Sequence, residues 1–181
     1  MKHGMGFLTL AALAGLFMAG CTGTETVTTT EPEAQAKPAA ATATFASLAK
    51  DGPVALYFAK RDCGSNGRAI PLVESVYKAY GSKVRMFAVV NATDEEYPGW
   101  SKGFGMSMPN VVDMDLSLVN TMGFKDSQHL VLVDKDGKAE EIEGGYGREA
   151  LMALNKALAK QAGVEPVELD LSAAPSGATY G

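Results

Sequence analysis

The sequence is poor in the side chains that most often carry protein chemistry. Its 181 residues include two cysteines, two histidines and one tryptophan. Two cysteines cannot form the disulfide framework that staples many small secreted domains. The charge balance, 16 basic against 21 acidic residues with a net charge of −5, lacks the basic excess typical of nucleic-acid-binding proteins, so we expect no nucleic-acid partner. The most apolar stretch, residues 7–17, is shorter than the roughly 20 residues of a membrane-spanning helix.

Residues 1–20 have the pattern of a secretory signal peptide. A short start with Lys2 precedes the apolar stretch, and small residues follow up to Cys21. The ending Ala19-Gly20-Cys21 resembles the bacterial lipobox, which implies cleavage after Gly20 and a lipid on the Cys21 sulfur. The alternative is an ordinary signal peptide with an incidental cysteine. We therefore expect a lipid-anchored protein of the bacterial cell envelope that faces the periplasm. Thr22, in place of an inner-membrane retention aspartate, slightly favours the outer membrane.

Composition divides the remaining chain into three parts. Residues 21–43 are small, polar and without period, so they cannot bury enough apolar surface to fold, and we predict a flexible lipidated tether. Residues 44–163 carry the apolar patterning of one folded domain. Residues 164–181 have no such pattern and are predicted to form a loose C-terminal tail.

Apolar runs and helical periods alternate along the predicted domain. Continuous apolar runs of strand length suit strands buried on both faces of a sheet, whereas apolar residues at helical spacing predict amphipathic helices. We predict strands at 53–59, 84–90, 110–113, 129–133 and 138–143, helices at 68–80 and 148–162, and weaker helical segments at 45–49, 94–106 and 116–122. This order predicts an α/β domain with a central mixed β-sheet flanked by helices.

Three segments, taken in order, resemble the thioredoxin superfamily. Residues 58–66 (Phe-Ala-Lys-Arg-Asp-Cys-Gly-Ser-Asn) stand where that family has an apolar strand, a turn and a Cys-x-x-Cys motif. Met108–Asp113 resembles its proline-led strand, and residues 123–137 resemble its hairpin. The sequence is most similar to redoxin-type, membrane-anchored thiol-disulfide proteins and to the alkyl hydroperoxide reductase/thiol-specific antioxidant group. The resemblance implies a thioredoxin-like fold with Cys63 at the position of the family's first redox cysteine.

The sequence departs from the family pattern at three positions. Asn66 replaces the second cysteine, Asp62 replaces the aromatic residue common before the first, and Gln128 replaces the family's cis-proline. A cis bond before a non-proline residue costs about 3–4 kcal/mol, so we predict a trans Ser127–Gln128 bond and a reshaped loop. The resemblance implies that Asn66, Ser127 and Gln128 flank the sulfur of Cys63.

Cys63 is the candidate nucleophile. We expect it at the start of a helix that follows a strand, where the helix N-terminus favours a thiolate. Lys60, Arg61 and Arg68 add positive charge nearby, while Asp62 opposes it. We therefore predict a modestly lowered pKa for the Cys63 thiol and take the three basic residues as candidate substrate-binding residues.

Two functions fit these residues. In the first, a membrane-anchored redoxin-like protein uses Cys63 alone for thiol–disulfide chemistry with a protein or small-molecule thiol, without a second sulfur to resolve the mixed disulfide. In the second, Cys63 is inert and the domain is a redox-inactive binding or scaffold module of the envelope. We expect no metal and no cofactor in either case. His129 is a candidate base for Cys63, and its alternative is a packed or solvated residue at a strand start.

Overall fold

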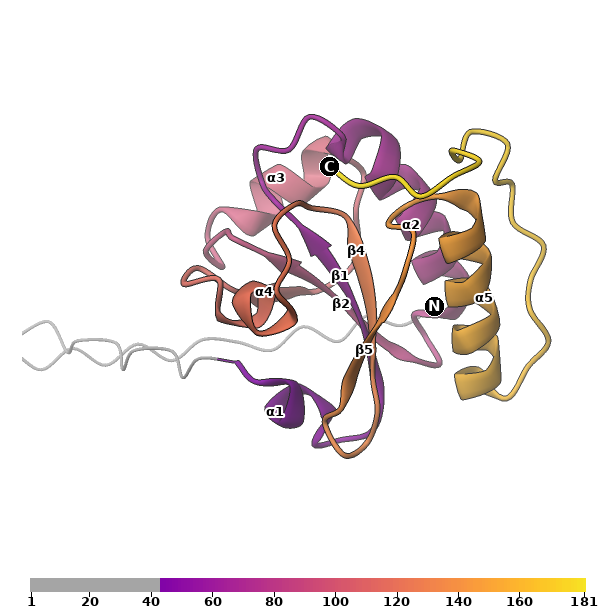
Figure 1. Ribbon diagram of the computed structural model, residues 1–181, viewed down its shortest axis with the longest axis horizontal. Helices are drawn as coiled ribbons and strands as arrows, with labels where there is room; N and C mark the ends of the chain where they lie inside the picture. The colour runs from indigo at the N-terminus through magenta and orange to yellow at the C-terminus, as the bar shows by residue number, and fades with distance from the viewer. Residues whose placement is uncertain (1–42) are drawn as a thin grey trace, which may run out of the picture. The chain divides into compact units, whose positions relative to one another are not determined.

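The computed structural model describes residues 43–181. The predicted signal peptide, Cys21 and all but the last residue of the predicted tether lie outside the described residues. Within the described range, no helix is both long and apolar enough to cross a membrane. The elements, in chain order, are α1 (Phe45–Ala49), β1 (Val54–Ala59), α2 (Asn66–Tyr80), β2 (Arg85–Val90), α3 (Tyr97–Gly103), β3 (Asn110–Val112), α4 (Ser117–Met122), β4 (His129–Val133), β5 (Ala139–Ile142) and α5 (Arg148–Ala162) (Figure 1).

The five strands form one mixed sheet in the order β3-β2-β1-β4-β5. β1 pairs in parallel with β2, and β2 with β3, whereas β4 lies antiparallel to both β1 and β5. Helices connect the parallel strands, because a parallel pair needs a crossover, while a tight turn suffices for the antiparallel pair β4 and β5. The predicted α/β domain with a central mixed sheet is confirmed.

The central strand β1 is buried along its whole length, which explains its continuous apolar sequence. Successive side chains of a strand point to opposite faces, and in β1 they enter two separate apolar cores. Ala55, Tyr57 and Ala59 belong to the core that includes α2 and α5. The alternate residues, Val54, Leu56 and Phe58, belong to the core that includes α1 and α4. The sheet is therefore covered on both faces.

Two predicted helices differ from the structure at their ends. α2 begins at Asn66, with Ser65 as its N-cap residue, so Cys63 precedes the helix instead of starting it. The weak helix predicted over 94–106 is limited to α3. Pro98 lies in the first turn of α3, where a missing N–H leaves no helical hydrogen bond unmade.

Residues 164–181 contact the rest of the domain at several points, and residues 175–181 are held by main-chain hydrogen bonds, so the predicted loose tail is wrong. Leu169 and Leu171 contact the core that includes α2 and α5, and Ala174 is buried. Farther along, the Thr179 N–H donates to the Gly144 carbonyl, and the Thr179 carbonyl accepts from the Tyr146 N–H, both at 3.0 Å. Main-chain hydrogen bonds hold much of this segment, and they leave no periodic pattern in the sequence.

Candidate functional site

Cys63 lies in the turn between β1 and α2, beyond the carboxyl end of the central strand. Its thiol is free and half-buried. The Cys63 carbonyl accepts a hydrogen bond from the Asn66 N–H at 3.2 Å, and its Sγ lies 3.0 Å from the Ser65 Oγ. The sulfur therefore sits beside the N-terminal end of α2, where main-chain N–H groups have no partner within the helix.

The pKa of the Cys63 thiol lies below its ordinary value. Partial burial raises this pKa by disfavouring the thiolate, but hydrogen bonds from the Ser65 hydroxyl and amide and from the side chains of Gln128 and Ser127 lower it by more. The predicted lowering of the Cys63 pKa is therefore confirmed. Its cause differs from the prediction, because neutral hydrogen-bond donors lower the pKa and not the basic side chains that were expected to do so. A lowered pKa enlarges the thiolate fraction, and the thiolate is the nucleophilic form.

Asn66, at the family's second-cysteine position, is buried and hydrogen-bonded through both ends of its amide. Its Nδ2 donates to the main-chain oxygens of Lys60 (2.9 Å) and Arg61 (3.2 Å). Its Oδ1 accepts from the Gln128 Nε2 at 2.8 Å. Asn66 thus closes the turn that carries Cys63, and it supplies no sulfur to resolve a mixed disulfide.

Gln128 occupies the family's cis-proline position with a trans peptide bond. No cis peptide bond occurs in residues 43–181, so the predicted trans bond is confirmed. Gln128 has a φ of 74°, which is uncommon for a residue other than glycine. Its N–H donates to the Phe58 carbonyl at 2.8 Å, and its Oε1 accepts from the buried Tyr57 hydroxyl. These bonds hold the residue in its left-handed conformation beside the sulfur.

Tyr57 completes a chain of three buried polar side chains, Tyr57–Gln128–Asn66. Burial raises the pKa of Tyr57 well above its ordinary value, and negative charge on Cys63 or Tyr146 raises it further, so Tyr57 stays a neutral donor. The sequence pattern gave no sign of Tyr57, because it lies inside a continuous apolar run. The sequence did contain one indication of this contact. Two positions of the family's site, 66 and 128, both carry amide side chains here, which implies that Asn66 and Gln128 contact each other.

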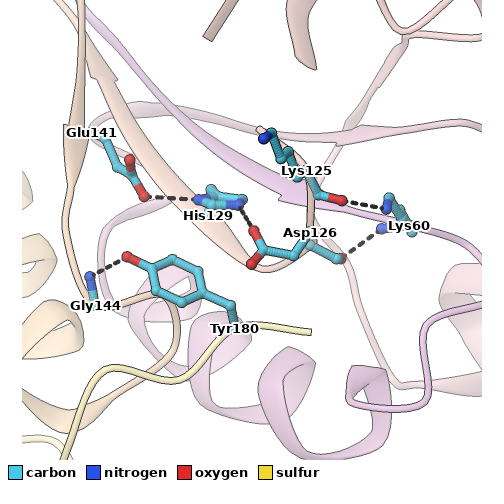
Figure 2. Close-up of polar contacts among 8 residues, drawn as sticks. Lys60, Lys125, Asp126, His129, Glu141, Gly144 and Tyr180 are labelled. Carbon is cyan, nitrogen blue, oxygen red and sulfur yellow. Dashed lines mark hydrogen bonds and ion pairs between the residues drawn. The ribbon is translucent and has the colours of Figure 1, made fainter. Parts of the chain in front are cut away.

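The three candidate substrate-binding residues do not surround the sulfur. The Lys60 Nζ donates to the Lys125 carbonyl at 3.1 Å, which Figure 2 shows on the loop before β4. The Arg61 guanidinium pairs with Glu96 at 2.5 Å on the surface. Arg68 is exposed in the first turns of α2. All three remain near the turn that carries Cys63, but two of them already have partners.

Ser127 contributes its main chain as well as its hydroxyl. Its Oγ accepts from the Lys60 N–H at 2.9 Å, which ties the turn after β1 to the loop before β4. Its N–H donates to the Gly181 carbonyl, and its carbonyl accepts from the Gly181 N–H, both at 3.0 Å. Gly181 is thereby held over Cys63, since a Cβ atom built on Gly181 would lie 2.5 Å from the Cys63 Sγ. No pattern in the sequence predicts this contact.

His129 is buried in a site of its own (Figure 2). Its Nδ1 lies 2.7 Å from a Glu141 oxygen, its Nε2 lies 2.6 Å from an Asp126 oxygen, and its ring stacks on Phe124. Both ring nitrogens are thus engaged by carboxylates, which leaves neither directed at Cys63 and favours the alternative of a packed residue. Over residues 43–181, no group of three or more histidine, cysteine and acidic side chains is arranged to hold a metal ion.

Comparison with known proteins gives structural matches only. No family model matches the sequence, and no curated protein matches it significantly. A solved thiol:disulfide interchange protein from Bacteroides sp. shares 17% identity, with 61% of this chain and 76% of that chain covered and a TM-score of 0.50. The thioredoxin domain of a thiol-disulfide oxidoreductase from Bacteroides vulgatus shares 19% identity, with 61% of this chain and 81% of that chain covered and a TM-score of 0.49. A secreted disulfide oxidoreductase from Mycobacterium tuberculosis shares 16% identity, with 64% of this chain and 84% of that chain covered and a TM-score of 0.44.

At such identities the likeness concerns the fold, and fold alone does not assign an activity. It agrees with the mixed five-stranded sheet flanked by helices that is found here. It also agrees with the segments that resemble the superfamily in the sequence. The chain has a thioredoxin-like fold.

Proposed function

We propose that the protein is an envelope-anchored thiol–disulfide protein that acts through Cys63 alone. The observation that carries the proposal is the Cys63 thiol itself, which is half-buried, lies beyond the central strand of a thioredoxin-like fold and has a lowered pKa. A half-buried thiol with a lowered pKa suits a reactive cysteine better than a structural one. The structural match at a TM-score of 0.50, which is named as a thiol:disulfide interchange protein, shares the fold on which this chemistry is proposed.

The proposed reaction is thiol–disulfide exchange in two steps. The Cys63 thiolate attacks one sulfur of a protein or small-molecule disulfide, a new Cys63 disulfide forms, the original S–S bond breaks, and the departing thiolate takes a proton from water. A thiol from a second molecule then attacks the mixed disulfide and regenerates Cys63. The number of disulfide bonds is unchanged in each step, so no other oxidant or reductant is required.

The remaining parts of the proposal concern placement. A lipid on Cys21 and the tether that follows it would hold the domain at the periplasmic face of an envelope membrane, with the outer membrane preferred. Lys60, Arg61 and Arg68 would contact acidic groups of the partner. Arg61 would first have to exchange its surface partner Glu96, which is inexpensive because exposed ion pairs contribute little.

The test is mixed-disulfide formation with oxidised glutathione. In the full chain carrying Cys21→Ser, Cys63 is the one thiol, and we expect mass spectrometry to show one added glutathione on the folded protein at neutral pH. The Cys63→Ser variant in the same background should show none. Addition that occurs only after denaturation would overturn the proposal.

A second candidate function is a redox-inactive binding or scaffold module. The position of Gly181 against the Cys63 sulfur favours this function, because a thiol that is covered in the folded protein can have a purely structural role. In that case Cys63→Ser changes stability alone, and glutathione addition to the native chain is absent.

A further inference from the structure

Residues 175–181, called the strap below, run along residues 144–148 and end over Cys63 (Figure 1). The Pro175 carbonyl accepts from the Arg148 N–H at 2.8 Å, and Thr179 exchanges two main-chain hydrogen bonds with residues 144–146. Gly181 exchanges two more with Ser127, each at 3.0 Å. The strap is therefore fixed at its start, middle and end by main-chain groups.

Glycines on both sides permit this close approach. A Cβ atom on Gly181 would clash with the Ser65 Oγ and lie 2.5 Å from the Cys63 Sγ. A Cβ atom on Gly147 would clash with the Gly177 carbonyl oxygen. By contrast, a Cβ atom on Gly177 would meet nothing within 4 Å. The contact thus depends on missing side chains at particular positions.

One aromatic side chain adds to the main-chain contacts. The Tyr180 hydroxyl accepts from the Gly144 N–H at 2.9 Å, and its ring centroid lies 4.8 Å from that of His129. Figure 2 shows the Tyr180 ring between Gly144 and the His129 group. His129, which has no role toward the sulfur, thereby forms part of the surface on which the strap lies.

We propose that the strap is an intramolecular cap and that it must leave Cys63 before the thiol reacts. The inference rests on the proposed function, since it concerns access to the same sulfur. A sulfur of the partner has to come within bonding distance of the Cys63 Sγ, about 2 Å. Gly181 lies directly against the Sγ and occupies space that the partner sulfur would need. The same displacement frees the Ser127 N–H and carbonyl. Cys63 therefore reacts from a locally opened form of the chain.

The test is the rate at which Ellman's reagent labels Cys63 in the native full chain, with Cys21→Ser in every variant. Gly181→Ala and Gly147→Ala should displace the strap by direct clash, and Gly177→Ala is the matched control. Loss of two or more hydrogen bonds predicts labelling about tenfold faster, or more, in the first two variants. Hydrogen exchange at the Thr179 amide reports independently whether the strap has been released.

Three outcomes decide the matter. Faster labelling in Gly181→Ala and Gly147→Ala, with Gly177→Ala unchanged, supports the cap. Wild-type labelling that is already fast and equals that of both variants, with Thr179 exchange raised in the variants, overturns the cap and leaves the proposed function standing. Labelling that stays slow after Thr179 exchange shows release overturns both, because the sulfur is then unreactive even when uncovered.

Discussion

The side chains around Cys63 replace a second sulfur and a proline with a hydrogen-bonded pair of amides. Asn66 and Gln128 bond to each other, and Tyr57 bonds to Gln128. Buried polar groups stabilise a fold only when all of them have partners, since an unpaired one incurs its full desolvation cost. The changes at 66 and 128 are therefore understood together, as two halves of one buried contact.

Replacing Gln128 tests this coupling. Gln128→Leu leaves the Tyr57 hydroxyl and the Asn66 Oδ1 buried without a partner, and we expect a loss of about 2–4 kcal/mol in the free energy of unfolding. Urea denaturation measures the change. Gln161→Leu, which removes a single bond to the Pro53 carbonyl on the surface, is the control and should cost about 0.5 kcal/mol or less. Equal losses in both variants would contradict the coupling.

Ser65→Ala tests the origin of the lowered Cys63 pKa. Hydrogen bonds stabilise the thiolate in the folded state, so the folded pKa lies below the ordinary thiol value. The associated stability is present above the unfolded pKa and is lost as pH falls through the folded pKa. Without the Ser65 hydroxyl, the pH midpoint of Cys63 labelling should move upward. Ser75→Ala, whose hydroxyl bonds to the Leu72 carbonyl, should leave the midpoint in place.

At this scale the position of the sulfur was predictable and its surroundings were not. Cys63 follows an apolar run of strand length, and that local pattern is enough to place it beyond a strand. Tyr57 and Gln128 are 71 residues apart, and Asn66 and Gln128 are 62 apart. No local pattern connects such positions before the sheet has brought β1 and β4 together.

At the scale of helices and strands, burial explains why the sequence predictions held. All five predicted strands are present, because continuous apolar runs mark β1, β2 and β4, and the Asp136-Gly137 turn marks the hairpin of β4 and β5. The ends were less accurate, since helix ends depend on caps. Ser65 is a preferred N-cap residue type, but Gly64 and Gly67 on either side of it are typical of a loop, so the sequence predicted a start at residue 68 where α2 begins at Asn66.

Replacing two glycines of the helices by alanine tests whether local backbone conformation determines where the helices end. Gly163 ends α5 with a φ of 67°, and a Cβ atom there would meet nothing within 4 Å. Gly163→Ala should therefore lower stability by about 1 kcal/mol through backbone strain alone. Gly67, inside α2 and equally open, gives the opposite sign, with Gly67→Ala raising stability by about 0.5–1 kcal/mol. Thermal unfolding of the two variants measures both.

At the scale of the whole molecule, the folded domain extends beyond the boundary that the sequence suggests at residue 163. Residues 164–181 are small and polar in large part, without helical or strand period, so composition predicts a tail. Their contacts are specific nevertheless, because Tyr80 and Asn155 bond to the main chain of Val167 and the strap bonds to residues 144–148. Such main-chain pairing leaves no apolar period in the sequence, although it requires glycine where the two segments approach most closely.

Shortening the chain separates the two roles of this segment. Removing residues 175–181 alone uncovers Cys63 but leaves Leu169 and Leu171 on the core, so thiol labelling should accelerate while stability falls by about 1–2 kcal/mol. Removing residues 164–181 also exposes apolar surface beside α5, and the total loss should reach about 3–5 kcal/mol. Urea denaturation compares the two with the intact chain, and Val164→Ala, an exposed position, is the near-neutral control. Equal stability of all three lengths would show that the domain ends at residue 163 after all, because a segment that contributes to the core cannot be removed without cost.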